Sequence, residues 1–426
     1  MDTIDTLTPC GDACGDYTMS RRSLLRNAAI AGAAGAVTSV FGDAVTQTVF
    51  GATTGPQKVL VLLSLRGGAD GLSMVVPHAE AAYYTARPNT AVAKSSLIAQ
   101  DDRFGLHPAF APLQSMWTSG RMAAIQAVGL PAPNRSHFEA MELIEDADPT
   151  SSARIGWLNR MIGSLAGSDP FEGMYLGGTQ VPTSLYGPDT AVAANDLASL
   201  DLPFGNEVAK RAVLAQGLTD AYAARSDVLG RAGATAVSVA DRSTNVRALG
   251  SSRPQNGAAY TGDALGKSLG QAAAVIRAGV GARAITVDYG SWDHHEGVQY
   301  RVSSMITGLA KNLAAFFTDL GAAGDDVTVV TLSEFGRRLA QNGSYGLDHG
   351  YGNAVLALGG GVKGGQYYGR WPSLTSGGKP VDDLAVTTDF RHVLGEVLDR
   401  RFPDVSLSSV FPGSGYASSG RLGFMA

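Results

Sequence analysis

The sequence of 426 residues contains only two cysteines, Cys10 and Cys14, and both lie close to the N-terminus. Both precede an arginine pair, Arg21-Arg22, which is followed by an uncharged run rich in Ala and Gly from residue 27 to residue 41. If this segment is removed on export, the mature chain has no cysteine, which excludes a disulfide framework and a thiolate metal site. Its stability must then come from a hydrophobic core.

The sequence also lacks a basic excess and a long apolar run outside the N-terminal segment. Its formal net charge is −5, so it carries no positive field of the kind that holds nucleic acid. The run from residue 27 to residue 41 is too short and too weakly apolar for a membrane span, which needs roughly 20 apolar residues. We therefore expect no nucleic-acid partner and no stable membrane span in the mature protein.

The N-terminal segment indicates a twin-arginine signal, which directs folded proteins to the twin-arginine export machinery. We expect residues 1–52 to be the signal peptide with a short linker and residues 53–426 to be the exported domain, periplasmic or extracellular. Cleavage after Ala44 or as late as Ala52 stays open, as does an ordinary first helix with a chance arginine pair. Export of the folded chain suits a protein whose metal is inserted before it leaves the cytoplasm.

From Lys58 onward, apolar runs of strand length alternate with helical patterns. The runs at 59–65, 122–129, 282–288 and 327–333 are continuous, as expected for parallel strands that are buried on both faces. Strands separated by helices predict an α/β fold with a mostly parallel central sheet and helices on both faces.

The segment 177–252 differs from the rest, because it has no strong strand pattern and contains two predicted helices, near 206–224 and 227–239. We expect it to be a mainly helical cap insertion.

Acidic and imidazole side chains follow several of the predicted strands. In chain order they are Asp70, Asp293, His295, Glu334, Asp348 and His349. Ligands bind beyond the carboxyl ends of parallel strands, so these side chains can meet at one edge of the sheet. Oxygen and imidazole donors that converge are what a divalent metal ion needs. The sequence therefore predicts one or two divalent metal ions, zinc, manganese or calcium.

Each of these motifs also has a structural interpretation. The loop around His294 could be held by hydrogen bonds, with His294 itself in solvent. Asp348 could orient the His349 ring instead of binding a metal. Glu334 could pair with Arg337 or with its neighbour Arg338. These alternatives stay open on the sequence alone.

Ser136 is the candidate nucleophile, because it lies between Arg135 and His137 at the predicted start of a helix. Its hydroxyl could attack a phosphoryl or sulfuryl group held by the helix-terminal amides and by Arg135. Arg66, at the end of the first strand, could bind an anionic substrate oxygen. Alternatively, Ser136 only caps the helix, with Glu139 as its capping-box partner. His137 could bind or orient a ligand, or lie on the surface of the first turn.

At these residues the chain resembles a twin-arginine-exported family of unknown function that is placed in the alkaline phosphatase-like superfamily and is sometimes labelled sulfatase-like. The matching motifs are Leu-Arg-Gly-Gly-Ala-Asp-Gly-Leu (65–72), Arg-Ser-His-Phe (135–138), Trp-Asp-His-His (292–295), Ser-Glu-Phe-Gly-Arg (333–337) and Asp-His-Gly-Tyr-Gly-Asn (348–353). The resemblance implies a sheet with helices on both faces, one or two divalent metals at the strand ends, and a covalent intermediate on a Ser, Thr or formylglycine nucleophile. It implies that Ser136 is the nucleophile and that the metal ligands are Asp293, His295, Glu334 and His349, with Asp70 as a further candidate.

Two departures from the superfamily pattern narrow this expectation. The chain lacks the Cys/Ser-x-Pro-x-Arg frame of formylglycine sulfatases, which disfavours a sulfatase of that mechanism. Glu334-Phe335 stands where the superfamily has an Asp-His pair, which removes one imidazole and favours a single metal or a site with mostly oxygen ligands, such as manganese or calcium prefer.

The sequence as a whole predicts a secreted metal-dependent hydrolase. Its substrate would be an anionic small-molecule or cell-surface ester, a phosphate ester before a sulfate ester, attacked by Ser136. The alternative is a non-catalytic secreted binding or envelope-assembly protein that retains the hydrolase fold.

Overall fold

The computed structural model describes residues 57–148, 154–165, 169–200, 246–413 and 420–426, together with isolated positions between 213 and 239. The predicted signal peptide, residues 1–52, lies outside the described residues. The two helices predicted within the insertion also lie outside them, apart from the isolated positions. Among the helices that are described, none combines the length and the apolar character that a membrane span requires.

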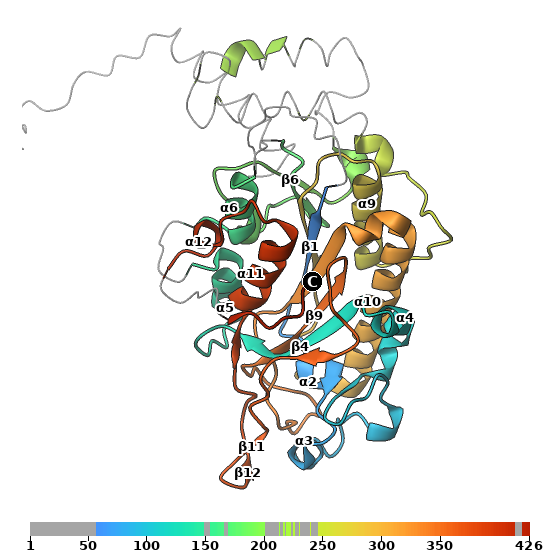
Figure 1. Ribbon diagram of the computed structural model, residues 1–426, viewed down its shortest axis with the longest axis vertical. Coiled ribbons are helices and arrows are strands. Elements are labelled where there is room, and N and C mark those ends of the chain that lie inside the picture. Colours follow the sequence, from blue (N-terminus) through green and yellow to red (C-terminus); the bar gives the residue numbers. More distant parts are fainter. Residues whose placement is uncertain are drawn as a thin grey trace, which may run out of the picture.

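A central β-sheet organises the described part of the chain (Figure 1). The strand order is β10-β4-β9-β8-β1-β7-β5-β6, and β13 also pairs with β4. β9 is antiparallel to both of its neighbours, whereas the other pairs in this sheet are parallel. The mostly parallel sheet is therefore confirmed. Its strands are β1 (Val59–Leu65), β4 (Met122–Gly129), β5 (Gly173–Leu176), β6 (Ala191–Ala194), β7 (Ala284–Tyr289), β8 (Val327–Leu332), β9 (Asn353–Gly359), β10 (Tyr367–Tyr368) and β13 (Thr388–Asp389).

Helices cover both faces of this sheet, with α9 and α10 on one face and α5, α6 and α11 on the other (Figure 1). Side chains of β1 alternate between the two cores: Val61 and Leu63 pack in the core that contains residues of α9 and α10, and Leu60 and Leu62 in the core that contains residues of α5, α6 and α11. A strand buried on both faces reads as a continuous apolar run for this reason. The longer helices are α5 (His137–Asp146), α6 (Trp157–Gly163), α9 (Ala264–Arg277), α10 (Val298–Leu320) and α11 (Phe390–Arg401).

Short elements complete the described fold. Two small antiparallel pairs lie apart from the main sheet, β2 (Val75–Val76) with β3 (Gly105–Leu106) and β11 (Thr375–Ser376) with β12 (Lys379–Pro380). The short helices are α2 (Gly71–Met74), α3 (Ala81–Ala86), α4 (Gln114–Thr118) and α12 (Leu407–Val410), and the 3-10 turns are η1 (Lys94–Ser96), η2 (Pro108–Leu113), η3 (Thr183–Leu185), η4 (Leu197–Ser199) and η5 (Gly321–Asp325).

Strand β6 lies inside the segment 177–252, for which the sequence predicts no strong strand, and that expectation is wrong at this point. β6 pairs in parallel with β5, so residues 191–194 belong to the central sheet. The strand escapes the pattern because it is only four residues long and three of them are alanine, a residue that is depleted in strands.

The carboxyl ends of β1, β4, β7 and β8 lie at one edge of the sheet. β7 and β8 are both parallel to β1, and β4 runs in the same direction because both β4 and β8 are antiparallel to β9. The first residue of β9, Asn353, lies at this edge too. Loops after β1, β4, β7 and β8, and before β9, therefore meet there, and they carry the candidate site.

Candidate metal centre

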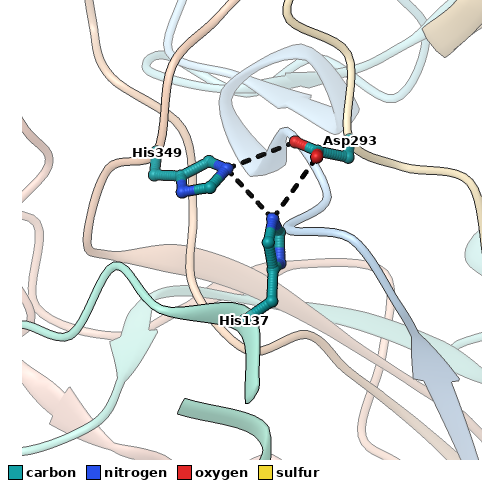
Figure 2. A group of neighbouring side chains, drawn as sticks. All are labelled: His137, Asp293 and His349. Atoms are coloured by element: carbon teal, nitrogen blue, oxygen red, sulfur yellow. Dashed lines mark hydrogen bonds and ion pairs between the residues drawn. The ribbon is translucent and has the colours of Figure 1, made fainter. Parts of the chain in front are cut away.

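Three side chains from three of these loops point toward one another (Figure 2). His137 opens α5 after β4, Asp293 follows β7, and His349 precedes β9. The Nε2 atoms of His137 and His349 are 3.0 Å apart. Asp293 places Oδ1 3.3 Å from Nε2 of His349 and Oδ2 3.5 Å from Nε2 of His137. One ligand atom from each residue lies within 4.8 Å of the other two, a spacing that one cation can bridge.

A third imidazole, His295, adjoins this group. Its Nε2 atom lies 2.9 Å from Oδ1 of Asp293 and 3.1 Å from Nε2 of His349. The two oxygens of Asp293 thus face different imidazoles, Oδ2 toward His137 and Oδ1 toward His295 and His349. We call His137, Asp293, His295 and His349 the imidazole cluster.

Each imidazole of the cluster has an oxygen at its other ring nitrogen. The Nδ1 atoms lie 2.9 Å from their acceptors, which are Oε1 of Glu334 for His137, Oδ1 of Asp348 for His295 and the backbone carbonyl of Arg135 for His349. Because an ionised carboxylate or a carbonyl oxygen can only accept a hydrogen bond, each Nδ1 is the donor, and the Nε2 of a neutral ring then carries a lone pair. When all three rings are neutral, three lone pairs converge beside the Asp293 carboxylate.

Two imidazole lone pairs that face each other cannot form a hydrogen bond unless one ring takes up a second proton. Burial lowers the pKa of His349, and the charge of Arg337 lowers it further, which disfavours a second proton on the His349 ring. A divalent cation between the rings satisfies both lone pairs. Neutral imidazole nitrogens with one carboxylate are a donor set typical of zinc. The residues of the cluster therefore fit a divalent metal ion.

Glu334 holds the His137 ring and lies outside the cluster. It is only 3% exposed. Its Oε1 atom accepts the N–H of Gly67 at 2.7 Å as well as the proton of His137, and its Oε2 atom accepts the Ser333 hydroxyl at 3.1 Å. With both oxygens engaged in this way, the carboxylate fixes the orientation of an imidazole.

Asp348 has the corresponding role for His295. Its Oδ1 atom also accepts the side-chain amide of Asn342 at 3.0 Å. The hydrogen bonds from His295 and Asn342 lower the pKa of Asp348, which keeps this carboxylate ionised. Asp348 thus contacts the ring of His295, whereas the sequence analysis proposed that it could orient the ring of His349.

Arg337 ties the loops of the site together and is 2% exposed. Its guanidinium donates to Oδ1 of Asp293 at 2.7 Å, to the Gly68 carbonyl at 2.6 Å and to the Leu347 carbonyl at 2.9 Å. Partial burial raises the pKa of Asp293, but the hydrogen bond and charge of Arg337, with His295 and His349, outweigh burial and lower it to about 2. Asp293 is therefore an anion at neutral pH, and Arg337 pairs with it, whereas the sequence offered Glu334 as the partner.

Asp70 lies apart from the imidazole cluster in a buried ion pair. Its two oxygens accept from Nη1 and Nη2 of Arg87 at 2.6 and 3.0 Å, and both side chains are almost completely buried. The structure thus places this candidate ligand in a contact that joins α2 to the segment after α3.

Ser136 directly precedes His137 and is the N-cap of α5. Its hydroxyl oxygen accepts the N–H of Glu139 at 3.5 Å, the contact that the capping-box pattern predicts. The residue is exposed to solvent. Capping uses a lone pair of the hydroxyl, so the O–H proton stays available to another acceptor.

The two arginines that the sequence offers for anion binding are both paired with carboxylates. Arg135 forms an ion pair with Asp383, and its carbonyl is the one that holds His349. Arg66 contacts Glu145 at 2.7 Å and Asp288 at 2.6 Å. Neither guanidinium therefore presents an uncompensated charge to the cluster.

Two open cavities border the cluster, and Asp293 lines both. One, of about 460 Å³, runs beside His137 and along α5. The other, of about 570 Å³, lies beside His294 and the first turns of α10. His294 itself is buried, in contrast to the solvated position that the sequence left open for it.

His137 is the cluster residue that the sequence pattern leaves undecided between a ligand and a surface residue. The signal that points to it is its position: it begins the helix that follows β4, at the same edge as the loops that carry the other candidates. The orienting roles of Glu334, Asp348 and Arg337 depend on contacts across loops, which spacing alone does not reveal.

Comparison with known proteins gives a match to a family and similarities to solved structures. The profile of a family described as "Protein of unknown function (DUF1501)" matches residues 108–395. No curated protein matches the sequence. One similar solved structure is the C-terminal periplasmic domain of EcEptC from Escherichia coli in complex with Zn, with 9% identity, a TM-score of 0.32, and coverage of 74% of this chain and 76% of that one. Another is the alkaline phosphatase of the Antarctic bacterium TAB5, with 10% identity, a TM-score of 0.28, and coverage of 74% and 95%.

Proposed function

The chain belongs to the DUF1501 family of proteins of unknown function, and we propose that it is an exported, metal-dependent hydrolase of phosphate esters, with sulfate esters as the second choice. The observation that carries this proposal is the convergence of three imidazole Nε2 atoms on the Asp293 carboxylate, each ring held by an oxygen at its Nδ1 atom. Histidines arranged only for packing do not need matched acceptors on their outer nitrogens and facing lone pairs on their inner ones.

His137, Asp293 and His349 supply the metal ligands in this proposal, and His295 lies beside them as a further donor. A divalent ion held there, with zinc the best match to the donors, would polarise the ester oxygens and lower the pKa of the nucleophile. Glu334, Asp348 and the Arg135 carbonyl fix the ring orientations before any metal binds. Arg337 keeps Asp293 ionised and in place.

Ser136 is the proposed nucleophile. It adjoins the ligand His137 and stands at the N-terminus of a helix of ten residues, whose free amides favour an anionic group. In the first step its Oγ forms a bond to phosphorus, and the departing alcohol takes up the serine proton. In the second step a water molecule cleaves the phosphoserine, restoring the hydroxyl and releasing phosphate.

The experiment that tests this function combines metal analysis with a panel of aryl phosphate monoesters, diesters and sulfates. We expect the exported wild-type protein to contain a divalent metal and to hydrolyse phosphate esters. Ser136→Ala should keep the metal and lose turnover by at least about a hundredfold. Asp263→Ala, which removes the side-chain N-cap of α9, controls for the loss of a helix cap alone.

Two outcomes would change the account. A wild-type protein that binds metal and hydrolyses none of the esters would contradict the hydrolase proposal and favour the secreted binding protein. Turnover that survives Ser136→Ala would remove this nucleophile and assign the attack to water.

A further inference from the structure

We propose that the substrate is a phosphodiester with a neutral, polyhydroxylated ring, such as a sugar unit, on each side of the phosphoryl group. This inference rests on the proposed function of the imidazole cluster. It comes from the space, the exposed aromatic rings and the charge balance on the two sides of Asp293.

The first observation is that there are two cavities at one carboxylate. The cavity along α5 includes His137, Phe138 and Glu145 in its lining, and the cavity along α10 includes Tyr300 and Arg301. Asp293 belongs to both linings. A phosphate monoester needs room for one alcohol group beside the metal, whereas a diester needs room for two. The pair of cavities matches the diester.

The second observation is an exposed aromatic ring in each cavity. Phe138 is 89% exposed and Tyr300 is 77% exposed, although leaving apolar surface in water costs about 25 cal/mol for each Å². Single exposed apolar side chains are common on protein surfaces, but each of these two rings also lines a cavity beside Asp293. The C–H face of a sugar ring is flat and weakly apolar, so it stacks on such rings while its hydroxyls stay hydrated.

The third observation is that charged groups of both cavities have partners of opposite sign. In the cavity along α5, Glu142 contacts Arg154 at 3.1 Å and Glu145 contacts Arg66 at 2.7 Å. In the cavity along α10, Arg301 contacts Glu296 at 3.4 Å. Paired charges of this kind require no ionic ligand, but their remaining lone pairs and N–H groups suit hydroxyl groups. Arg66 is shared between Glu145 and Asp288, so the cavity along α5 keeps an acidic excess that suits a neutral polar ring better than a polyanion.

The length of the cavity along α5 agrees with a ligand of one or two sugar rings. His137, Met141 and Glu145 line it from one face of α5, at i, i+4 and i+8. Eight residues of an α-helix rise by about 12 Å, which accommodates one or two sugar rings between the metal ligand His137 and the Glu145–Arg66 pair.

The reaction that follows is an internal cleavage. Ser136 Oγ displaces one sugar alkoxide from phosphorus, and that alkoxide takes the serine proton to leave as an alcohol. Water then cleaves the phosphoserine and releases the second sugar as its phosphate monoester. One water is consumed, and one diester becomes one alcohol and one monoester.

The test compares a synthetic glucose-phospho-glucose diester with bis(4-nitrophenyl) phosphate and 4-nitrophenyl phosphate on the metal-loaded enzyme. We expect kcat/KM to be higher for bis(4-nitrophenyl) phosphate than for the monoester. Phe138→Ala and Tyr300→Ala should each raise KM for the sugar diester about tenfold, with a smaller effect on kcat. Tyr186→Ala is the matched control, because Tyr186 is 54% exposed and lines neither cavity.

Failure of this inference is distinguishable from failure of the proposed function. If nitrophenyl esters are hydrolysed but the monoester is preferred, or both alanine variants match Tyr186→Ala, the sugar-diester inference is overturned and the hydrolase stands. Preference for a diester of ethanolamine over the sugar diester would overturn it too. If no ester is hydrolysed, saturation-transfer NMR with the sugar diester decides: binding that Phe138→Ala abolishes supports the sugar site, and no binding overturns it.

Discussion

For each histidine of the imidazole cluster, the oxygen that contacts its Nδ1 atom determines the orientation of the ring as much as the residues at its Nε2 atom do. A carbonyl such as that of Arg135 can only accept a hydrogen bond, so His349 keeps its proton on Nδ1, and the Nε2 atom of the neutral ring turns a lone pair toward Asp293. Glu334 and Asp348 act in the same way on the other two rings. At this scale the site is a set of lone pairs that is already oriented, which reduces the reorganisation needed to bind an ion.

The orienting role of Asp348 leads to a graded prediction. Asp348→Asn should weaken zinc affinity about 10- to 100-fold without abolishing it, because the ring of His295 loses its ionised acceptor but keeps its Nε2 atom. His349→Ala should remove stoichiometric binding, because it removes a ligand. Competition with a chromophoric chelator measures both, and Asp102→Asn, at an exposed position, is the control. Equal affinities for Asp348→Asn and wild type would show that Asp348 does not orient the ring.

Arg337 should matter for stability even without metal. Arg337→Ala leaves Asp293 without its guanidinium partner and the Gly68 and Leu347 carbonyls without a donor. We expect the free energy of unfolding to fall by about 1–3 kcal/mol for each carbonyl that is left without a donor, as measured by urea denaturation of the metal-free protein. Arg338→Ala, at the less buried neighbouring position, should cost much less. Equal losses for the two variants would contradict the assignment.

Among the structural elements, the loop after β1 determines how closely the site loops approach one another. Gly67 has φ of +111°, and a Cβ atom on it would lie 2.8 Å from the backbone nitrogen of Asp293 and 2.9 Å from that of Trp292. Its own N–H holds Glu334. The loop after β1 therefore packs directly against the loop that carries Asp293, and no side chain fits between them.

Gly67→Ala should consequently disturb the site. The substitution forces an L residue into a left-handed backbone region, at a cost of about 1–3 kcal/mol, and displaces the backbone at Asp293. We expect a lower melting temperature together with weaker metal binding, measured by thermal unfolding with and without zinc. Gly343→Ala, where a Cβ meets nothing within 4 Å, should change neither. If Gly67→Ala retained full metal affinity, the close packing would have no functional role.

Elements with strong local signals are predictable from the sequence. β1 and β4 match the apolar runs at 59–65 and 122–129, and α10 matches the predicted helix over 298–320, because burial on both faces or an amphipathic repeat leaves a clear pattern. β5 and β6 are short and escape it, since their stability comes from neighbouring strands.

The candidate site is predictable in part for a similar reason. Strand-end position brings Asp293, His295 and His349 to one edge of the sheet, as expected. The contacts that distinguish an ion-facing side chain from an orienting one are tertiary. Spacing in the sequence alone therefore does not show whether His137 is a ligand or a surface residue. It also does not show whether Glu334 and Asp348 bind an ion or orient a ring.

At the scale of the whole molecule, a preorganised metal site agrees with export in the folded state, since folding in the cytoplasm allows the metal to be inserted before the chain meets other ions. Residues 1–52 carry the predicted signal for that route. Because the sequence has no cysteine after Cys14, a domain exported by this route would not depend on disulfide formation at its destination.

Export should therefore depend on the arginine pair. Changing Arg21-Arg22 to Lys-Lys should leave the protein uncleaved in the cytoplasm, because the signal is read as a paired-arginine motif. Cell fractionation of a bacterial host that has this export machinery measures the outcome. Arg26→Lys, a change outside the pair, should be exported normally. Equal export of the Lys-Lys variant and wild type would contradict twin-arginine export.

The most direct test of the metal site is X-ray diffraction from crystals of the zinc-loaded protein, recorded on both sides of the zinc absorption edge. We predict an anomalous peak about 2.0–2.2 Å from Nε2 of His137, Nε2 of His349 and a carboxylate oxygen of Asp293. No peak at the imidazole cluster, with the His137 and His349 rings still in direct contact at full zinc loading, would contradict the account.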